Sequence, residues 1–315
     1  MSAAIRVEGL VKRYGSFTAV NDISFDVKEG EIFGILGPNG AGKTTTLEII
    51  EGLQKPTAGN VNVLGGDVLR EANRIKSRIG IQLQASAYFN YLSLLEILRL
   101  LASFYPKSAN ANELLNVVGL EDKGKSRIDQ LSIGQRQRFT VAASLINDPE
   151  LVILDEPTTG LDPQARHNLW DLIRDINHRK VTVVLTTHYM EEAESLCQRL
   201  AIMDQGRIIA IDSPSNLISQ IETTYTIKLV TSNPLTVKQQ STLQKGATFQ
   251  EVEIDPDSQP LAGNPYVLRL DKTSEALNDT LDGIVSSGIS LKHLEILPAT
   301  LEDVFLELTG NELRE

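Results

Sequence analysis

The feature that most limits what this chain can fold into is a glycine-rich segment between two regular runs. The segment reads Gly37-Pro38-Asn39-Gly40-Ala41-Gly42-Lys43-Thr44, with Thr45 next. Residues 31–36 before it suit a short buried strand, and residues 45–51 after it suit the first turns of a helix. Strand, loop and helix in this order are the context of a phosphate-binding loop, so we predict that the segment binds a nucleoside triphosphate. An ordinary glycine-rich turn is the alternative, but the pattern arises by chance in only roughly 1% of chains this long.

The residue types in this segment suit a phosphate-binding loop. Gly37, Gly40 and Gly42 allow backbone angles that a Cβ atom would forbid, so that successive N–H groups can converge on an anion at the positive end of the following helix. Lys43 supplies a cation for the outer phosphates, and Thr44 offers a hydroxyl to the Mg²⁺ that accompanies them. We therefore expect ATP or a similar nucleotide with Mg²⁺.

Charge, cysteine content and hydropathy exclude several classes of protein. The net charge is −11, and residues 222–315, with 7 basic and 15 acidic residues, carry most of it. Without a basic stripe the chain lacks the charge that drives nucleic-acid binding, so no nucleic-acid partner is expected. The single cysteine, Cys197, has no disulfide partner within the chain, and we interpret it as a small hydrophobe in a reduced compartment. No apolar run reaches the ~18 residues of a membrane span, so a spanning part would be another chain.

The order of the predicted elements indicates two domains. Strands and helices alternate through residues 1–221, which predicts an α/β fold with a mostly parallel central sheet. Residues 222–315 predict a small α+β domain. The expected buried strands are 31–36, 151–154 and 181–186, the expected helices are 94–105, 111–118 and 163–178, and the expected second-domain elements are strands 225–230, 266–270 and 291–297 with a helix at 274–286. Trp170, beside the apolar face of the 163–178 helix, is expected to serve packing.

Two adjacent carboxylates follow the apolar run 151–154. Asp155 and Glu156 stand at its C-terminal end, which is the edge where open α/β sheets bind ligands. Asp155 can hold Mg²⁺ through its water shell, and Glu156 can orient or deprotonate the water that attacks the terminal phosphate. The alternative is an acidic turn before Pro157. With a phosphate-binding loop in the same chain, we favour hydrolysis.

A third motif makes the set specific. Leu131-Ser132-Ile133-Gly134-Gln135 heads a predicted helix, and a serine and a glycine at a helix start can form a second anion site. Along the chain, the phosphate loop is followed by this segment, the paired acids, Thr159-Gly160-Leu161-Asp162 and His188. This order of motifs resembles the nucleotide-binding subunit of an ATP-binding cassette (ABC) transporter. The resemblance spans residues 5–220 and implies a P-loop ATPase with an antiparallel N-terminal β part and a helical insertion.

The resemblance also implies roles for individual residues. Tyr14 is similar to the aromatic residue on which adenine stacks, and His188 to the histidine that contacts the terminal phosphate. Gln84 is similar to the glutamine that reaches the metal and senses the membrane partner, with Gln82 as its rival for that role. In that family, two subunits associate head to tail, so Ser132, Gly134 and Gln135 would cap the ATP held by the other subunit and Asp162 would cross the interface.

This sequence departs from the family pattern at one signature position. Ile133 stands where the commonest signature has glycine, which narrows the permitted dihedral angles but keeps the backbone N–H groups.

The C-terminal region narrows the resemblance further. Residues 298–310 resemble the ending of ATPase subunits of bacterial daunorubicin-resistance and multidrug exporters, in a helix with Leu301, Val304, Phe305 and Leu308 on one stripe. We therefore expect a peripheral ATPase on the cytoplasmic face of the membrane, in a homodimer or heterodimer, driving a separate permease.

Several alternatives stay open at this stage. Residues 88–92, after Gln84, offer aromatics either to that permease or to the core. An importer is an alternative to an exporter, and a soluble translation or repair ATPase is an alternative to both.

Overall fold

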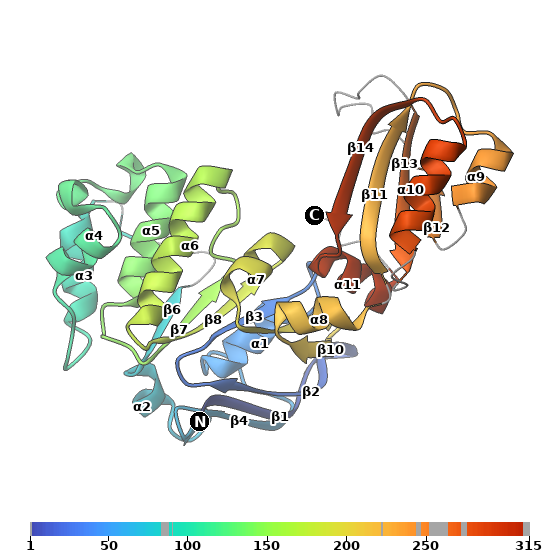
Figure 1. Ribbon diagram of the computed structural model, residues 1–315. Coiled ribbons are helices and arrows are strands. Elements are labelled where there is room, and N and C mark those ends of the chain that lie inside the picture. The colour runs from blue at the N-terminus through green and yellow to red at the C-terminus, as the bar shows by residue number, and fades with distance from the viewer. Residues whose placement is uncertain are drawn as a thin grey trace. The chain divides into compact units, whose positions relative to one another are not determined.

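The computed structural model describes residues 2–82, 88–89, 91–221, 223–243, 247–251, 264–271 and 276–310. The chain divides into two compact units, with the division between Ser215 and Asn216. Each unit is described by itself below, with the elements labelled as in Figure 1. No helix among the described residues has both the length and the hydrophobicity needed to cross a membrane.

The first unit is built on a six-stranded sheet, and the prediction of a mostly parallel sheet is confirmed. Its strand order is β10-β9-β3-β8-β7-β6, and every neighbouring pair is parallel except β9 with β10. All residues of β3, β7 and β8 are buried, as strands covered on both faces require. The strands are β3 Ile32–Leu36, β6 Ile79–Gln82, β7 Leu151–Asp155, β8 Thr182–Thr187, β9 Arg199–Asp204 and β10 Arg207–Asp212.

An antiparallel sheet from the N-terminal part forms a second layer. Its order is β2-β1-β4-β5, with β1 Ala3–Tyr14, β2 Phe17–Lys28, β4 Ala58–Val63 and β5 Gly66–Asp67. Helix α1, Lys43–Ile50, shares one hydrophobic core with both sheets, because Leu47 and Ile49 cluster with Val7 of β1 and Ile153 of β7. This core fixes the start of α1 against the carboxyl ends of the central strands.

The other helices cover the central sheet and form the insertion. Helix α5 packs on β6, α6 on β8, and α7 on β3 and β8, while α3 and α4 gather against α5 (Figure 1). The predicted helix 94–105 is shorter than expected and ends at Ala102, with Ser103 as its C-cap. The helices are α2 Ala72–Lys76, α3 Leu94–Ala102, α4 Ala111–Val117, α5 Ile133–Ser144, α6 Pro163–His178 and α7 Met190–Leu196, with 3₁₀ turns at Glu121–Lys123 and Ile128–Gln130. Helix α8, Pro214–Gln220, spans the division between the two units.

The second unit contains a four-stranded antiparallel sheet in the order β12-β13-β11-β14. Its core includes Ile227, Leu229, Tyr266 and Leu268 from β11 and β13, and Ile284 from α10. The predicted elements are present, but α9 and β12 were not predicted. The elements are β11 Thr223–Thr231, α9 Val237–Leu243, β12 Ala247–Glu251, β13 Asn264–Asp271, α10 Ala276–Ser286, β14 Leu291–Pro298 and α11 Leu301–Thr309.

Helix α11 differs in part from the expected apolar stripe. Leu301, Val304 and Phe305 are buried, but Leu308 is 43% exposed, since the buried face ends before the last turn.

The expectation for Trp170 is confirmed, because its side chain is buried in α6.

A glycine in β6 tests the packing of α5 on the central sheet. A Cβ atom at Gly80 would lie 2.0 Å from the carbonyl oxygen of Ser144, a backbone atom at the end of α5. We expect Gly80→Ala to lower the free energy of unfolding by about 1–3 kcal/mol, because strand and helix must separate. Chemical denaturation measures this. The neighbouring Ile81→Val is the control and should cost about 1 kcal/mol or less; equal stability of Gly80→Ala and wild type would contradict the packing described here.

Candidate functional site

The predicted phosphate-binding loop lies between β3 and α1, and its glycines are required for different reasons. Gly40 and Gly42 have φ angles of 82° and 102°, in the left-handed region that favours glycine. Gly37 does not have a positive φ, so the expectation of a special backbone angle there was wrong. Instead, a Cβ atom at Gly37 would lie 2.1 Å from the carbonyl oxygen of Met203, so Gly37 is needed for space.

Lys43 lies at the centre of the loop. Its ammonium group donates hydrogen bonds to the carbonyl oxygens of Gly37 at 2.8 Å and Pro38 at 3.1 Å, and lies 3.3 Å from Oε1 of Glu156. Burial lowers the pKa of Lys43, while the nearby carboxylates of Glu156 and Asp155 act against this shift. The lysine and the second of the paired acids, 113 positions apart in the sequence, therefore meet in the fold.

Asp155 is held by hydroxyl groups from two elements. The Thr44 hydroxyl, at the start of α1, lies 3.1 and 3.4 Å from the two carboxylate oxygens of Asp155. Thr186 stands opposite Asp155 in the parallel pairing of β7 with β8, and its hydroxyl donates to Asp155 Oδ1. The same Thr186 oxygen accepts the backbone N–H of Glu156 at 2.9 Å. One threonine thus fixes both paired acids.

Glu156 turns the chain directly after the strand. Its φ angle is 46°, which is uncommon for a residue other than glycine. Oε2 of Glu156 accepts a hydrogen bond from the Thr159 hydroxyl at 3.2 Å and lies 3.4 Å from Nδ1 of His188. The structure therefore brings Lys43, Glu156 and His188 together, as the sequence motifs predicted.

A cleft of about 310 Å³ lies beside the loop. Tyr14 lines it but is also 45% exposed, and its hydroxyl donates to Oε1 of Gln54 at 2.6 Å. Phe17, which sequence reasoning missed, is 63% exposed and pairs with Tyr14 across the β1–β2 hairpin. The predicted Gly37, Pro38 and Ala41 do not line the cleft, and the residues that do are Tyr14, Phe17, Ala19, Asn39, Gly40, Gly42, Lys43, Thr44, Thr45 and Glu156.

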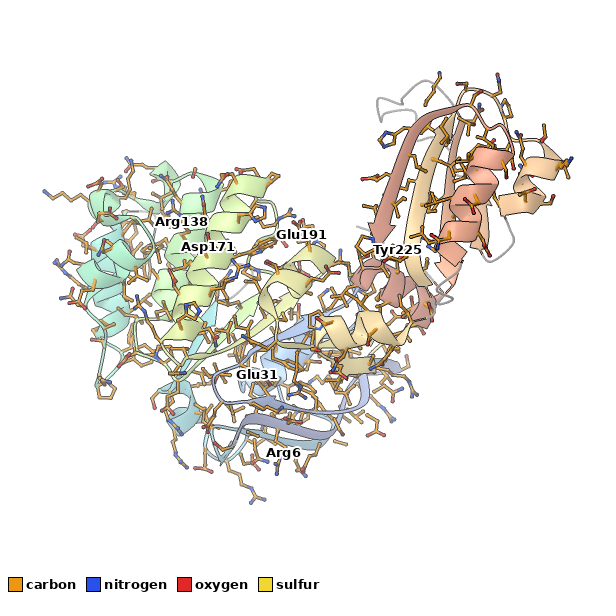
Figure 2. All side chains as sticks on the ribbon, viewed as in Figure 1. Arg6, Glu31, Arg138, Asp171, Glu191 and Tyr225 are labelled. Carbon is orange, nitrogen blue, oxygen red and sulfur yellow. The ribbon has the colours of Figure 1, made fainter. Side chains whose placement is uncertain are left out.

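The Ser132 segment lines a separate hollow of about 530 Å³. Ser132 caps α5, with its hydroxyl accepting from Gln135 N–H and Gln135 Oε1 accepting from Ser132 N–H. Asp162 caps α6 by accepting the Ala165 N–H at 2.9 Å, so two helix N-termini face one hollow. Arg138, labelled in Figure 2, lies on α5 and also lines it.

The cleft beside the loop and this hollow share no lining residue. The hollow is lined by the exposed Ile133 and by Ser132, Gly134, Gln135, Arg138, Gly160, Leu161, Asp162, Ala165 and Asn168. Ser132, Gly134, Gln135 and Asp162 are therefore not lining residues of the cleft beside Lys43.

Gln84 lies outside the described residues, but its rival Gln82 is described. Gln82 is buried in β6 and pairs with Leu154, the residue before Asp155. Successive strand residues point to opposite faces, so Gln82 and Asp155 lie on opposite faces of the sheet. Gly80, on the same face as Gln82, approaches α5. This placement is unfavourable for metal contact by Gln82.

The aromatic residues after Gln84 divide between core and surface. Tyr88 packs edge-on against the buried Phe139, with ring centroids 5.4 Å apart. Phe89 and Tyr91 are 54% and 69% exposed and contact each other at 5.8 Å. Tyr88 thus packs toward the core, whereas contact of Phe89 and Tyr91 with a permease stays a prediction.

The site has the chemical means for phosphate binding and hydrolysis. The Thr44 hydroxyl and the Asp155 carboxylate are neighbouring hard oxygen donors, which fits Mg²⁺ bound through few protein ligands and the phosphates of a nucleotide. Lys43 and the N-terminus of α1 provide positive charge for the phosphates. The carboxylate of Glu156 stands next to Lys43, where it can accept a proton from water.

Comparisons with known proteins agree with this geometry. Residues 20–159 match the family model described as "ABC transporter". The chain is 37% identical over 99% of both lengths to "Nod factor export ATP-binding protein I" of Paraburkholderia xenovorans. It is 38% identical to the protein of that name from Ralstonia nicotianae, covering 99% of this chain and 95% of that one.

Solved structures show the same fold for the first unit. An ATP-binding subunit of an ABC transporter has a TM-score of 0.62 and 28% identity, over 69% of this chain and 92% of that one. A bacterial ABC transporter cassette solved as a dimer has a TM-score of 0.61 and 28% identity, over 66% and 98%.

Thr186 provides a test of how the paired acids are held. Thr186→Val removes the acceptor of Glu156 N–H and the donor to Asp155, so we expect a loss of about 1–3 kcal/mol in stability together with weaker binding of Mg-nucleotide. Thermal unfolding and titration calorimetry measure the two effects. Thr182→Val is the control, because its hydroxyl accepts only the Gly30 N–H at the other end of β8. Thr182→Val should lose stability but keep its affinity for Mg-nucleotide. Unchanged nucleotide affinity in Thr186→Val would contradict the role of Thr186 in holding the two acids.

Proposed function

This chain belongs to the ATP-binding subunits of ABC transporters, and from that premise we propose that it powers an exporter of the type-two class. It binds and hydrolyses ATP, and the transporter uses that hydrolysis. We assign the ATPase to residues 1–221 and an accessory role to residues 222–315. The observation that carries the proposal is the meeting of Lys43 with Glu156 and of Thr44 with Asp155 at one sheet edge.

We assign the chemistry of the site as follows. Thr44 and Asp155 would hold Mg²⁺, with Gln84 as a further ligand, and the ion would neutralise charge on the phosphates. Lys43 and the loop N–H groups bind the phosphates and orient them. Glu156 receives the proton of the attacking water, and His188, whose Nδ1 lies 3.4 Å from Oε2 of Glu156, contacts the terminal phosphate. Tyr14, with Phe17 beside it, supplies the aromatic surface for adenine.

A second subunit would complete the site. The helix N-termini capped by Ser132 and Asp162 face a hollow large enough for phosphate oxygens, and they are separate from the phosphate loop of their own chain. A head-to-tail pair would place Ser132, Gly134 and Gln135 over the ATP of the other subunit. The dimeric solved cassette supports this arrangement. Nucleotide then favours the closed pair because it binds that pair better than the open one.

Export and the membrane partner are supported by other observations. Relatives over nearly the whole chain are named export proteins, and residues 298–310 resemble the ending of daunorubicin-type exporter subunits. We propose a peripheral location at the cytoplasmic membrane face, next to a separate permease. The exposed Phe89 and Tyr91, five and seven residues after Gln84 in the sequence, are the candidate contact with that permease. The exported compound would be a drug, a lipid or another small molecule. The comparisons give no support to a soluble translation or repair ATPase.

Glu156→Gln tests the assignment of the hydrolytic carboxylate. The amide keeps the shape of the site but no longer accepts a proton, so we expect kcat to fall by about 10²- to 10⁴-fold while ATP binding persists and a nucleotide-bound dimer accumulates. Phosphate release and light scattering after chromatography measure this. Glu150→Gln, which replaces an exposed carboxylate before β7, is the control. Near-normal turnover by Glu156→Gln would remove Glu156 from the mechanism.

Mixing two inactive variants tests the shared site. Lys43→Ala weakens phosphate binding, and Ser132→Arg blocks the second hollow. In a mixed dimer both changes fall in one site and leave the other intact. A mixture should therefore recover up to about a quarter of the wild-type rate, since half of randomly assorted dimers are mixed. If each variant is inactive and folded, and the mixture is equally inactive at every ratio, the site is not shared in this way.

A further inference from the structure

A fully buried carboxylate lies on α7, outside the residues that the hydrolysis mechanism uses. Glu192 is 0% exposed, and its Oε1 accepts a hydrogen bond from the indole Nε1–H of Trp170 at 3.0 Å. Trp170 is itself buried in α6. A carboxyl group in such a place is unfavourable unless its partners compensate for the lost water, so its surroundings call for an explanation.

The surroundings of Glu192 come from three separate segments. Burial raises the pKa of Glu192, and the hydroxyls of Thr187 and Thr158, the Trp170 indole and the charge of Arg166 all act against this rise. Thr158 follows β7, Thr187 ends β8, and Arg166 and Trp170 belong to α6. One carboxyl group thus stands at the junction of two strand ends and a helix.

These segments are the ones that carry Glu156 and His188. Thr158 stands two residues after Glu156 and Thr187 one residue before His188, and the Thr187 hydroxyl accepts the Tyr189 N–H at 2.9 Å. On the other side of the histidine, the Arg166 guanidinium lies 4.2 Å from the centre of the Tyr189 ring. Both sequence neighbours of His188 are therefore held by this cluster.

The hydrogen bonding of the cluster is incomplete. Four buried side-chain polar atoms of this cluster make no hydrogen bond to another described protein atom: Thr158 Oγ1, Arg166 Nε, His188 Nδ1 and Glu192 Oε2. The Thr158 hydroxyl is close enough to Glu192 to oppose the rise in its pKa, yet Thr158 Oγ1 and Glu192 Oε2 do not have the geometry of a hydrogen bond. Unmet polar groups in a core are uncommon, and their concentration beside His188 marks a place where small shifts can form new bonds.

We propose that Glu192 is a positioning residue for ATP hydrolysis, which holds the turn after Glu156 and the turn around His188 at a fixed separation. Trp170 fixes Glu192 from α6, and Arg166 fixes Tyr189 from the same helix. Since Asp162 begins α6 at the second hollow, this helix also connects the cluster to the proposed dimer contact. The inference rests on the proposed roles of Glu156 and His188.

Substitutions at Glu192 and Trp170 test the proposal in the full-length protein. Glu192→Ala removes the link and should lower kcat about tenfold or more with ATP affinity unchanged, because the phosphate loop is untouched. Glu192→Gln should recover most of that loss, since its carbonyl oxygen can accept the Trp170 N–H and its NH₂ group can donate to a threonine hydroxyl. Trp170→Phe keeps an aromatic ring but removes the donor, and should lower kcat by a smaller factor.

A matched core variant separates positioning from general stability. Ile176→Ala removes a buried side chain from the last turns of the same helix, away from the cluster. It should lower the melting temperature with kcat unchanged at a temperature where it is folded. The proposal is overturned if Glu192→Ala keeps wild-type kcat, if Glu192→Gln is no better than Glu192→Ala, or if Ile176→Ala loses kcat in step with its stability. Normal turnover by Glu156→Gln would instead remove the proposed function on which the inference rests.

Discussion

The parallel pairing of β7 with β8 is the constraint on which the site depends. It sets Asp155 opposite Thr186, and the hydroxyl of that threonine then binds the carboxylate of one acid and the backbone N–H of the next. On the same face, α1 is held by the core shared between the two sheets, and this brings Thr44 to Asp155. The meeting of loop and acids thus follows from strand register and core packing.

Local chemistry explains how much of this structure the sequence could predict. Continuous apolar runs identified β3, β7 and β8, since strands covered on both faces need no alternation. Helix α6 was predicted with its observed bounds because Asp162 caps its start and Pro163 follows at the first helical position. The elements α9 and β12 were missed because they are short and have no strong periodicity. Phosphate loop, paired acids and His188 were predicted together because their order is specific.

Other parts of the site depend on contacts that no local pattern encodes. Gly37 is required by the backbone at Met203, which belongs to β9, far away in the sequence. Strand register places Gln82 on the face away from Asp155, which no local pattern shows, and Gln84 lies outside the described residues. Phe17 could have been found from its position, since a two-residue turn separates it from Tyr14. Glu192 is one of three glutamates in α7, and only the packing of α6 against α7 shows that it is buried.

The backbone at Glu156 has a consequence for engineering this protein. A side-chain-bearing residue with a φ of 46° is strained by roughly 1 kcal/mol relative to glycine, so the position has been filled against conformational preference. A glycine there would relieve this strain but would also remove the carboxylate that faces the buried ammonium group of Lys43, and the loss of a buried ion-pair partner costs more than the strain. Selection for folding stability therefore favours the carboxylate at this position, independently of its proposed role in hydrolysis.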